Sequence, residues 1–281
     1  MSAIVSPADS HFPKLPLWPT IRLSYATYFQ HFGDGLRIAA LWLPVIATLD
    51  GIVGWLQASW MAELTANPQM QAKLAQSMPV VVLGNVAGLG LTCAAVSIAV
   101  AWHRLLLLNE APGLSGSNIG TRSLWRYVGI GILISLIAAL PVAVTLLPMW
   151  PLGLLPGVGR APALIAVGVL AYIVGVTLVL RLCLLLPARA AGDFNLTFKE
   201  AWRRTRGNVW RIFWGILACA VPPFVLTDLA YVAVILVPLG ADINPAQWAA
   251  ATAIGTCCWL LAWPIWVGFL SHTYRHFLSA V

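Results

Sequence analysis

Charge is scarce in this sequence: only 9% of its 281 residues are Asp, Glu, Lys or Arg, and only nine residues are acidic. A soluble domain has about 25% charged residues, and a disordered chain combines high charge with low hydropathy, so the composition excludes both classes. The sequence is instead 60% hydrophobic, with a mean hydropathy of +0.86. It also contains 14 tryptophans, a residue that concentrates where acyl chains meet headgroups. The composition predicts an integral membrane protein.

Cysteine is also scarce, and the motifs of common enzyme classes are missing. The five cysteines all fall inside apolar runs and have no spacing typical of a metal or redox site: Cys93, Cys183, Cys219, Cys257 and Cys258. The sequence has no hydrolase elbow, Walker loop, Rossmann glycine pattern or zinc helix. We therefore expect small packing residues rather than disulfides, no metal, no cofactor and no enzymatic activity.

Six apolar stretches are long enough for helices that cross the hydrocarbon core, which takes about 20 residues. They are residues 36–60, 79–108, 124–150, 162–190, 209–237 and 246–277. The predicted fold is therefore all-α, a polytopic membrane protein with six transmembrane helices in residues 36–281. Residues 1–35 form an N-terminal segment with an interfacial helix, and residues 191–208 form a basic connection.

Arginines recur at the ends of these stretches. Arg37, Arg126 and Arg211 begin the odd-numbered spans, and Arg104, Arg181 and Arg275 end the even-numbered ones. This repetition predicts three helical hairpins of similar length. The alternative is that each helix end simply carries a cation that reaches the headgroups.

The basic residues also indicate orientation. All 16 Lys and Arg except Lys73 and Arg160 fall on one side of the predicted membrane. Because positive loops stay inside the cell, both termini are expected in the cytoplasm.

Two segments outside the spans have the pattern of interfacial helices. Residues 21–32 carry apolar side chains at helical spacing, with Thr20 as the expected N-cap. In residues 197–208, Thr197 and Glu200 have the spacing of a capping box. The side chains expected to contact lipid headgroups here are Lys199, Trp202, Arg203, Arg204, Arg206, Trp210 and Arg211. A basic amphipathic helix of this kind favours the anionic inner leaflet and not nucleic acid.

The same region resembles a known family. A span that ends at Arg181 is followed by a polar turn, then by residues 197–202 (TFKEAW) and 207–211 (GNVWR). This segment resembles bacterial multispanning proteins grouped with the membrane domain of glycerophosphoryl diester phosphodiesterases, and with inner-membrane relatives of uncharacterised role. The resemblance implies about six helices and a bacterial cytoplasmic (inner) membrane. It does not imply the hydrolytic activity, because the catalytic barrel needs about 250 residues of its own.

A few polar residues fall inside the spans. Asp50 and Asp228 each follow a proline by six residues, and Asn85 is a candidate hydrogen-bond partner for Asp50. A buried carboxylate is costly in a bilayer, so such residues often serve ion pathways. Small residues around Gly84, Gly88 and Gly90, and Gly168 and Gly175 in the fourth span, predict close helix approach.

His272 and His276 are four residues apart, which permits a metal or haem, but histidines beside interfacial arginines are the more ordinary interpretation.

Two functions follow from these patterns. The first is a non-enzymatic membrane protein that organises lipids or assists the assembly of other membrane proteins. Its partners would be anionic phospholipids, and either other membrane proteins or further copies of itself. The alternative is a small transporter or channel that uses Asp50 and Asp228.

Overall fold

The computed structural model describes residues 13–66, 78–111, 113, 121–146, 161–236 and 244–279, and the regular structure of these residues is entirely helical. The helices are α1 (Leu17–Gln30), α2 (Phe32–Ala39), α3 (Trp42–Ala66), α5 (Met78–Leu108), α6 (Arg122–Leu146), α7 (Ala161–Leu182), α8 (Leu185–Ala191), α9 (Phe198–Arg204), α10 (Val209–Leu236) and α11 (Pro245–Leu278). Five helical stretches are long and apolar enough to cross a membrane, and α2 with α3 makes a sixth if they are one bent span. The described chain is therefore all-helical with five or six helices suited to span a membrane, as predicted.

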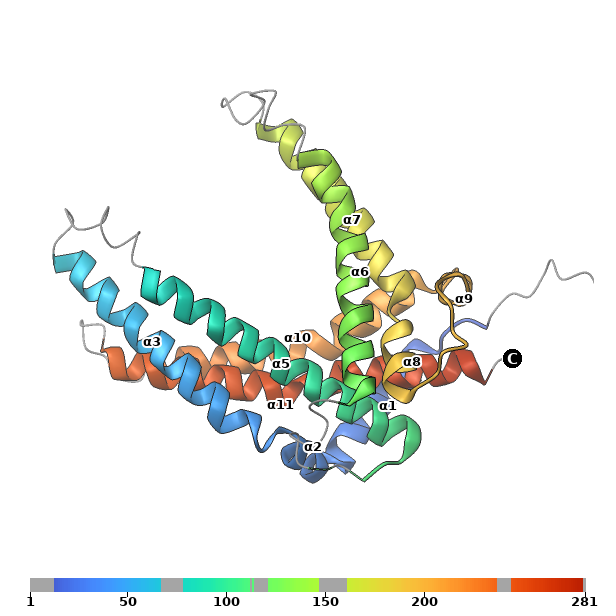
Figure 1. The fold of residues 1–281 in the computed structure, drawn as a ribbon, viewed down its shortest axis with the longest axis horizontal. Coiled ribbons are helices and arrows are strands. Elements are labelled where there is room, and N and C mark those ends of the chain that lie inside the picture. The colour runs from blue at the N-terminus through green and yellow to red at the C-terminus, as the bar shows by residue number, and fades with distance from the viewer. Residues whose placement is uncertain are drawn as a thin grey trace, which may run out of the picture.

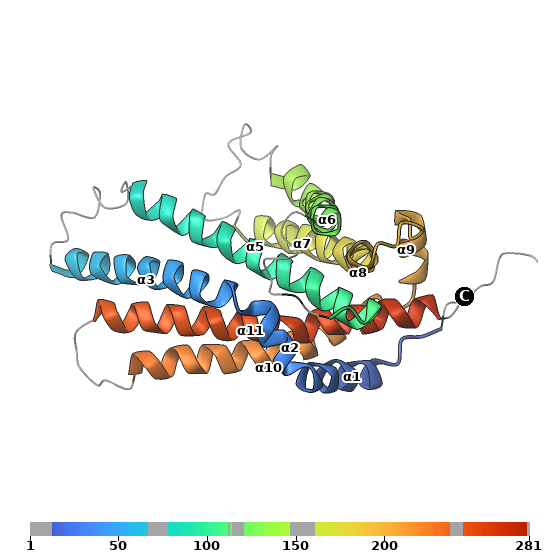
Figure 2. The ribbon, with the colours of Figure 1, turned by 60° about the horizontal axis from the view of Figure 1, so that its bottom comes forward.

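Two groups of helices diverge from one end of the molecule. α11 packs against α3 and α10, with further contacts to α5 and α1, and these long helices run alongside one another in Figure 2. α6 and α7 pack mainly on each other and stand at a steep angle to the other long helices (Figure 1). The groups meet where α1, α8, α9 and the end of α11 lie.

We call this meeting point the basic end, and the opposite helix ends the far ends. Every Lys and Arg of the described residues lies in a short helix (α1, α2, α8 or α9), in a segment before or between helices, or near the end of a long helix, at the basic end. Lys73 and Arg160, predicted for the other side, lie outside the described residues. Both limits of the described chain, residues 13 and 279, are also at the basic end.

The first predicted span is bent. The sequence predicts one helix over residues 36–60, but the chain breaks after Ala39, and α2 and α3 differ in direction by 59°. Pro44 lies four residues after Ala40 and has no N–H to donate to the Ala40 carbonyl, and its ring crowds that carbonyl. A slighter interruption separates α7 from α8, where Pro187 lies four residues after Cys183, but residues Ile165–Ala191 remain one stretch suited to span a membrane, close to the prediction.

α1 packs into the basic end by a partly polar face. Its buried residues are Thr20, Ile21, Ser24, Thr27 and Tyr28, whereas Phe29 is 68% exposed. The expectation that Thr20 caps this helix is wrong: the helix begins after Pro16, and the Thr20 hydroxyl donates to the Pro16 carbonyl at 2.8 Å. The spacing of apolar residues therefore predicted that a helix forms here, but it did not predict that the polar side chains of Thr20, Ser24 and Thr27 are buried.

The hydroxyls of α1 donate to backbone carbonyls of α10 and α11. The Tyr25 hydroxyl donates to Ala218 O at 2.9 Å, and the Tyr28 hydroxyl to Leu261 O at 3.0 Å. Pro222 explains the first of these bonds, since it has no N–H with which to occupy the Ala218 carbonyl within α10. Ser24 donates to the Ile265 carbonyl beside Pro264. α1 thus satisfies backbone acceptors near the prolines of two spans.

Close helix approach occurs at other glycines than most of those predicted. A Cβ on Gly54 would lie 2.3 Å from Thr252 Oγ1 on α11, and one on Gly175 would lie 2.6 Å from Ala138 O on α6. Of the predicted glycines, Gly175 and Gly90 make a close approach, since a Cβ on Gly90 would lie 3.3 Å from Leu49 Cδ1 on α3, whereas Gly84, Gly88 and Gly168 have no described heavy atom within 4 Å of their Cβ positions. Span two is therefore tightly packed from Gly90 onward, where Ala94 and Ala95 are also buried, but not around Gly84 and Gly88.

Candidate lipid-contact site

α9 carries most of the residues predicted to contact headgroups, and local bonds fix its start. The Thr197 side chain accepts the Glu200 N–H at 3.3 Å, so the predicted cap is confirmed. Gly192, with φ of 80°, ends α8 and turns the chain toward α9. Gly207, with φ of 77°, makes the next turn, into α10. Both turns use backbone conformations that favour glycine.

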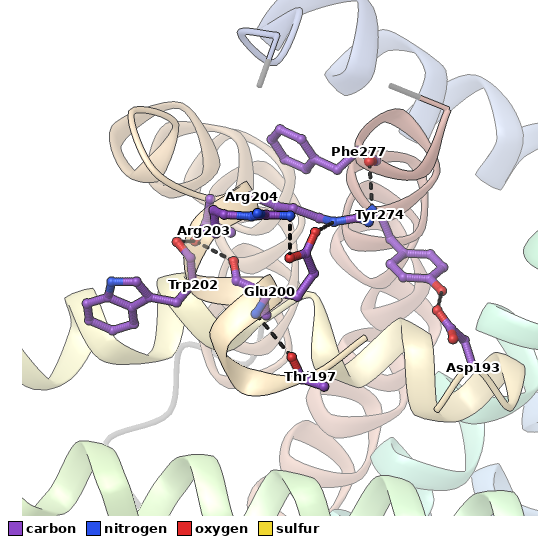
Figure 3. Close-up of polar contacts among 10 residues, drawn as sticks. Asp193, Thr197, Glu200, Trp202, Arg203, Arg204, Tyr274 and Phe277 are labelled. Carbon is purple, nitrogen blue, oxygen red and sulfur yellow. Dashed lines mark hydrogen bonds and ion pairs between the residues drawn. The ribbon is translucent and has the colours of Figure 1, made fainter. Parts of the chain in front are cut away.

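Glu200 holds two arginines of the same helix. Its carboxylate lies 2.8 Å from an Arg203 nitrogen and 2.7 Å from Arg204 Nε (Figure 3). Partial burial alone would raise the pKa of Glu200, but hydrogen bonds from Arg204 and Arg203 outweigh this and lower the pKa below its ordinary value. The carboxylate is therefore charged at neutral pH and neutralises part of the positive charge of α9.

Two further contacts fasten this region to α11, as Figure 3 shows. Arg204 donates to the Phe277 carbonyl at 2.9 Å, and the Tyr274 hydroxyl donates to the Asp193 carboxylate at 2.6 Å. Only 12% of the Arg204 side chain is exposed. Arg204 therefore holds α9 in place and does not face lipid as predicted.

The turn into α10 holds the segment that precedes α1. Asn208, which is buried, accepts the Leu15 N–H at 2.8 Å and donates to the Pro13 carbonyl at 3.4 Å. Arg211 donates to the Leu15 carbonyl at 2.7 Å. Arg211 is thus a structural residue. Residues 207–211 (GNVWR) bind the segment that precedes α1 through Asn208 and Arg211.

The other predicted contact residues face outward. Trp202, Arg203 and Trp210 have exposed fractions of 43%, 58% and 71%. Lys199 and Arg206 are also exposed. These five side chains form the outer surface of the basic end beside α7 and α10, and we call them the basic-aromatic surface.

An apolar groove runs between α7 and α10 and ends at the basic-aromatic surface. Its volume is about 680 Å³, and it is lined by Tyr172, Ile173, Val176, Thr177, Arg181, Gly207, Val209, Trp210, Phe213 and Leu217. A second hollow of about 560 Å³ between α6, α7 and α10 shares Tyr172, Val176, Phe213 and Leu217 with it. The two hollows therefore adjoin each other.

Arg181 is the cation at the mouth of this groove. Its guanidinium lies 4.9 Å from the centre of the Trp202 ring and donates to the Trp202 carbonyl at 3.3 Å. Its Nε is buried and has no hydrogen-bond partner in the described part of the chain. The sequence pattern placed Arg181 at a helix end but gave no sign of this role, because the contact with Trp202 spans the α8–α9 turn.

The polar residues predicted inside the spans do not meet. Asn85 donates to Val81 O on its own helix at 2.7 Å, not to Asp50. The Asp50 carbonyl accepts from the Thr252 hydroxyl at 3.0 Å. Asp228 is exposed and lines a separate cavity of about 340 Å³ with Tyr231 and Thr252, among others, but Asp50 does not line it.

Two histidines of the basic end, His103 and His272, contact hydroxyls, whereas the buried Nε2 of His276 has no hydrogen-bond partner among the described residues. His103 is fully buried, with Nδ1 2.7 Å from Ser271 Oγ, and His272 Nε2 lies 3.2 Å from Thr27 Oγ1. In the residues that the structure describes, no group of three or more His, Cys, Asp or Glu is arranged to hold a metal ion. His103 and His272 join α1, α5 and α11.

Comparison of the chain with models of protein families, with curated proteins and with solved structures finds no match. The site is therefore interpreted from its own geometry.

Proposed function

We propose that this chain is a non-enzymatic membrane protein that organises phospholipids, or assists the assembly of other membrane proteins, at a bacterial inner membrane. In this proposal the helices cross as three antiparallel pairs, α2–α3 with α5, α6 with α7, and α10 with α11. The basic end faces the cytoplasm, so that both termini are inside. The proposal includes a family relationship between this chain and the membrane domain of glycerophosphoryl diester phosphodiesterases.

The observation that carries this proposal is the basic-aromatic surface at the mouth of an apolar groove. Tryptophan prefers the headgroup boundary, and each cation near an anionic leaflet contributes about 1 kcal/mol of binding. Lys199, Arg203 and Arg206 project outward there, whereas Arg204 and Arg211 hold the helices that display them. The arrangement presents charge to a membrane surface.

Native mass spectrometry of the protein extracted in mild detergent tests the proposal. We expect retained phospholipid, with anionic species enriched over their share of the membrane. A triple variant with Lys199→Gln, Arg203→Gln and Arg206→Gln should lose this enrichment, because it removes exposed positive charge. The hydrogen bond that joins α9 to α11 comes from Arg204 and is retained in this variant. Unchanged enrichment in the variant, or delipidated wild-type protein, would contradict the proposal. A reporter fused after Arg204 tests the orientation and should be inside the cell.

One observation favours the alternative, a small transporter or channel. Asp228 borders a cavity with Thr227, Tyr231, Thr252 and Thr256, a set of oxygen atoms that could accept a cation or proton. If this function holds, proteoliposomes should show ion or proton flux that Asp228→Asn removes. Flux that survives both Asp228→Asn and Asp50→Asn would exclude coupling through these acids.

A further inference from the structure

We propose that the groove between α7 and α10 binds one anionic phospholipid, with the phosphate at Arg181 and Arg206 and an acyl chain along Val176 and Leu217. This inference rests on the proposed function and specifies its lipid site.

Two cations near the groove mouth lack a counter-charge. Arg181 lines the groove, and the exposed Arg206 directly precedes Gly207, which also lines it. In the described residues neither side chain has an ion-pair partner. The acids nearest in sequence are already engaged, since Asp193 accepts from Tyr274 and Glu200 binds Arg203 and Arg204. Two like charges at one site are best compensated by an anion.

Arg181 has donors left for that anion. Only one guanidinium hydrogen bond is made within the described chain, from a terminal nitrogen to the Trp202 carbonyl. Nε is left without an acceptor. The planar fork of an arginine fits two oxygens of a phosphate, and the Trp202 ring, whose centre is 4.9 Å from the guanidinium carbon, and the Trp202 carbonyl together hold the side chain in place. The guanidinium is therefore positioned before any ligand arrives.

The groove below Arg181 fits an acyl chain better than a soluble anion. Its volume of about 680 Å³ falls in the range of about 300–1,000 Å³ typical of ligand pockets. From Arg181 to Tyr172 it follows α7 for nine residues, ~14 Å of helix, and it adjoins the hollow beside α6. Apart from Thr177, the side chains between these two residues are apolar. A phosphate held by arginines above a long apolar groove is the pattern expected for a phospholipid.

Titration of the purified protein with phosphatidylglycerol, followed by native mass spectrometry, tests this site. Arg181→Gln should weaken binding about tenfold, because a charge-assisted hydrogen bond is lost, and Arg181→Lys should weaken it as well, because the fork is lost. Arg122→Gln removes the same charge from an exposed position at the start of α6 and should bind as the wild type does. Equal binding by Arg181→Gln and Arg122→Gln would overturn the site.

The acyl part of the proposal has its own pair of variants. Leu217→Trp fills the groove and should also weaken binding, whereas Leu136→Trp, on an exposed face of α6, should not. Displacement of the lipid by soluble glycerol 3-phosphate, or equal binding of phosphatidylethanolamine, would overturn an anionic phospholipid as the occupant. Circular dichroism checks that each variant retains its helices.

The outcomes separate this inference from the function on which it rests. If the wild-type protein binds no phosphatidylglycerol, the proposed function and the site both fail. If it binds phosphatidylglycerol equally in all variants, the proposed function stands and the site is wrong.

Discussion

At the basic end, side chains bond across segments that are far apart in the sequence, whereas toward the far ends such bonds are few. Residues 13–28 alone bond to Asn208, Ala218, Leu261 and Ile265. Between α3 and α11, the described polar contacts are Thr252 with the Asp50 carbonyl and Cys257 with the Leu43 carbonyl. Polar bonds therefore specify the junction of the helix groups, while apolar packing and close backbone approach hold the rest.

This difference follows the surroundings that each region would have in a bilayer. Helices in lipid satisfy their own backbone groups and gain little from the hydrophobic effect, so their contacts depend on small residues and close fit. Near the headgroups, loops and short helices expose backbone groups that need partners. Four predictions test this division, from the largest expected effect to the smallest.

Gly175→Leu should be the most destabilising of the four changes. Its side chain would collide with the Ala138 backbone carbonyl, since even a Cβ lies 2.6 Å from that oxygen, and overpacking costs about 1–3 kcal/mol. We expect a clear drop in the thermal unfolding temperature in detergent. Gly168→Leu is the matched control on the same helix, because no described heavy atom lies within 4 Å of its Cβ position. Equal losses in both variants would show that α6 and α7 are not held by close approach.

Asn208→Ala should destabilise the basic end by about 2 kcal/mol, because it leaves the buried Leu15 N–H without an acceptor. Asn85→Ala should have almost no effect, since Asn85 is exposed and bonds only within its own helix. Thermal unfolding measures both, and hydrogen exchange at residues 14 and 15 should rise only in Asn208→Ala. Similar effects of the two substitutions would remove the distinction between the regions.

Tyr25→Phe should cost about 1 kcal/mol, since the phenol hydroxyl is the hydrogen-bond donor to the Ala218 carbonyl. In a Pro222→Ala background the restored N–H can occupy that carbonyl, so Tyr25→Phe should cost less. A double-mutant cycle on unfolding free energies measures this coupling. Additive effects would mean that the missing proline N–H is not the reason for the bond.

Acidification should weaken the attachment of α9. Because the pKa of Glu200 is lowered in the folded protein, its charged form contributes stability at neutral pH that is lost as the pH falls below about 4.5. The difference in unfolding temperature between the wild type and Glu200→Gln should therefore shrink as the pH falls through that range. A difference that stays constant with pH would show that the ion pairs with Arg203 and Arg204 contribute nothing.

Hydropathy was sufficient to predict the long helices. The predicted span 79–108 corresponds to α5 (Met78–Leu108), and 246–277 to α11 (Pro245–Leu278). A long apolar segment satisfies its backbone N–H and C=O groups within itself only as a helix. Composition and length are therefore enough to predict these helices. The Thr197 cap was predictable for a similar reason, since it depends on residues three positions apart.

Long-range contacts at the basic end could not be predicted in this way. Arg204 and Arg211 look like lipid-facing cations in sequence, but their partners are backbone carbonyls of Phe277 and Leu15. A carbonyl is present at every residue, and its availability depends on how helices pack. The bend before α3 had a local signal in Pro44, yet Pro141 lies inside an unbroken helix, so proline alone does not decide where a span divides.

The docking of α1 imposes an order on biosynthesis. Its hydrogen-bond acceptors on other segments belong to residues 218–265, so the ribosome must produce most of the chain before α1 has anything to bind. The first helix to emerge is thus among the last to reach its final place. Until α10 and α11 have been synthesised, the hydroxyls of α1 lack these protein acceptors. A chain truncated before α10 would never supply them.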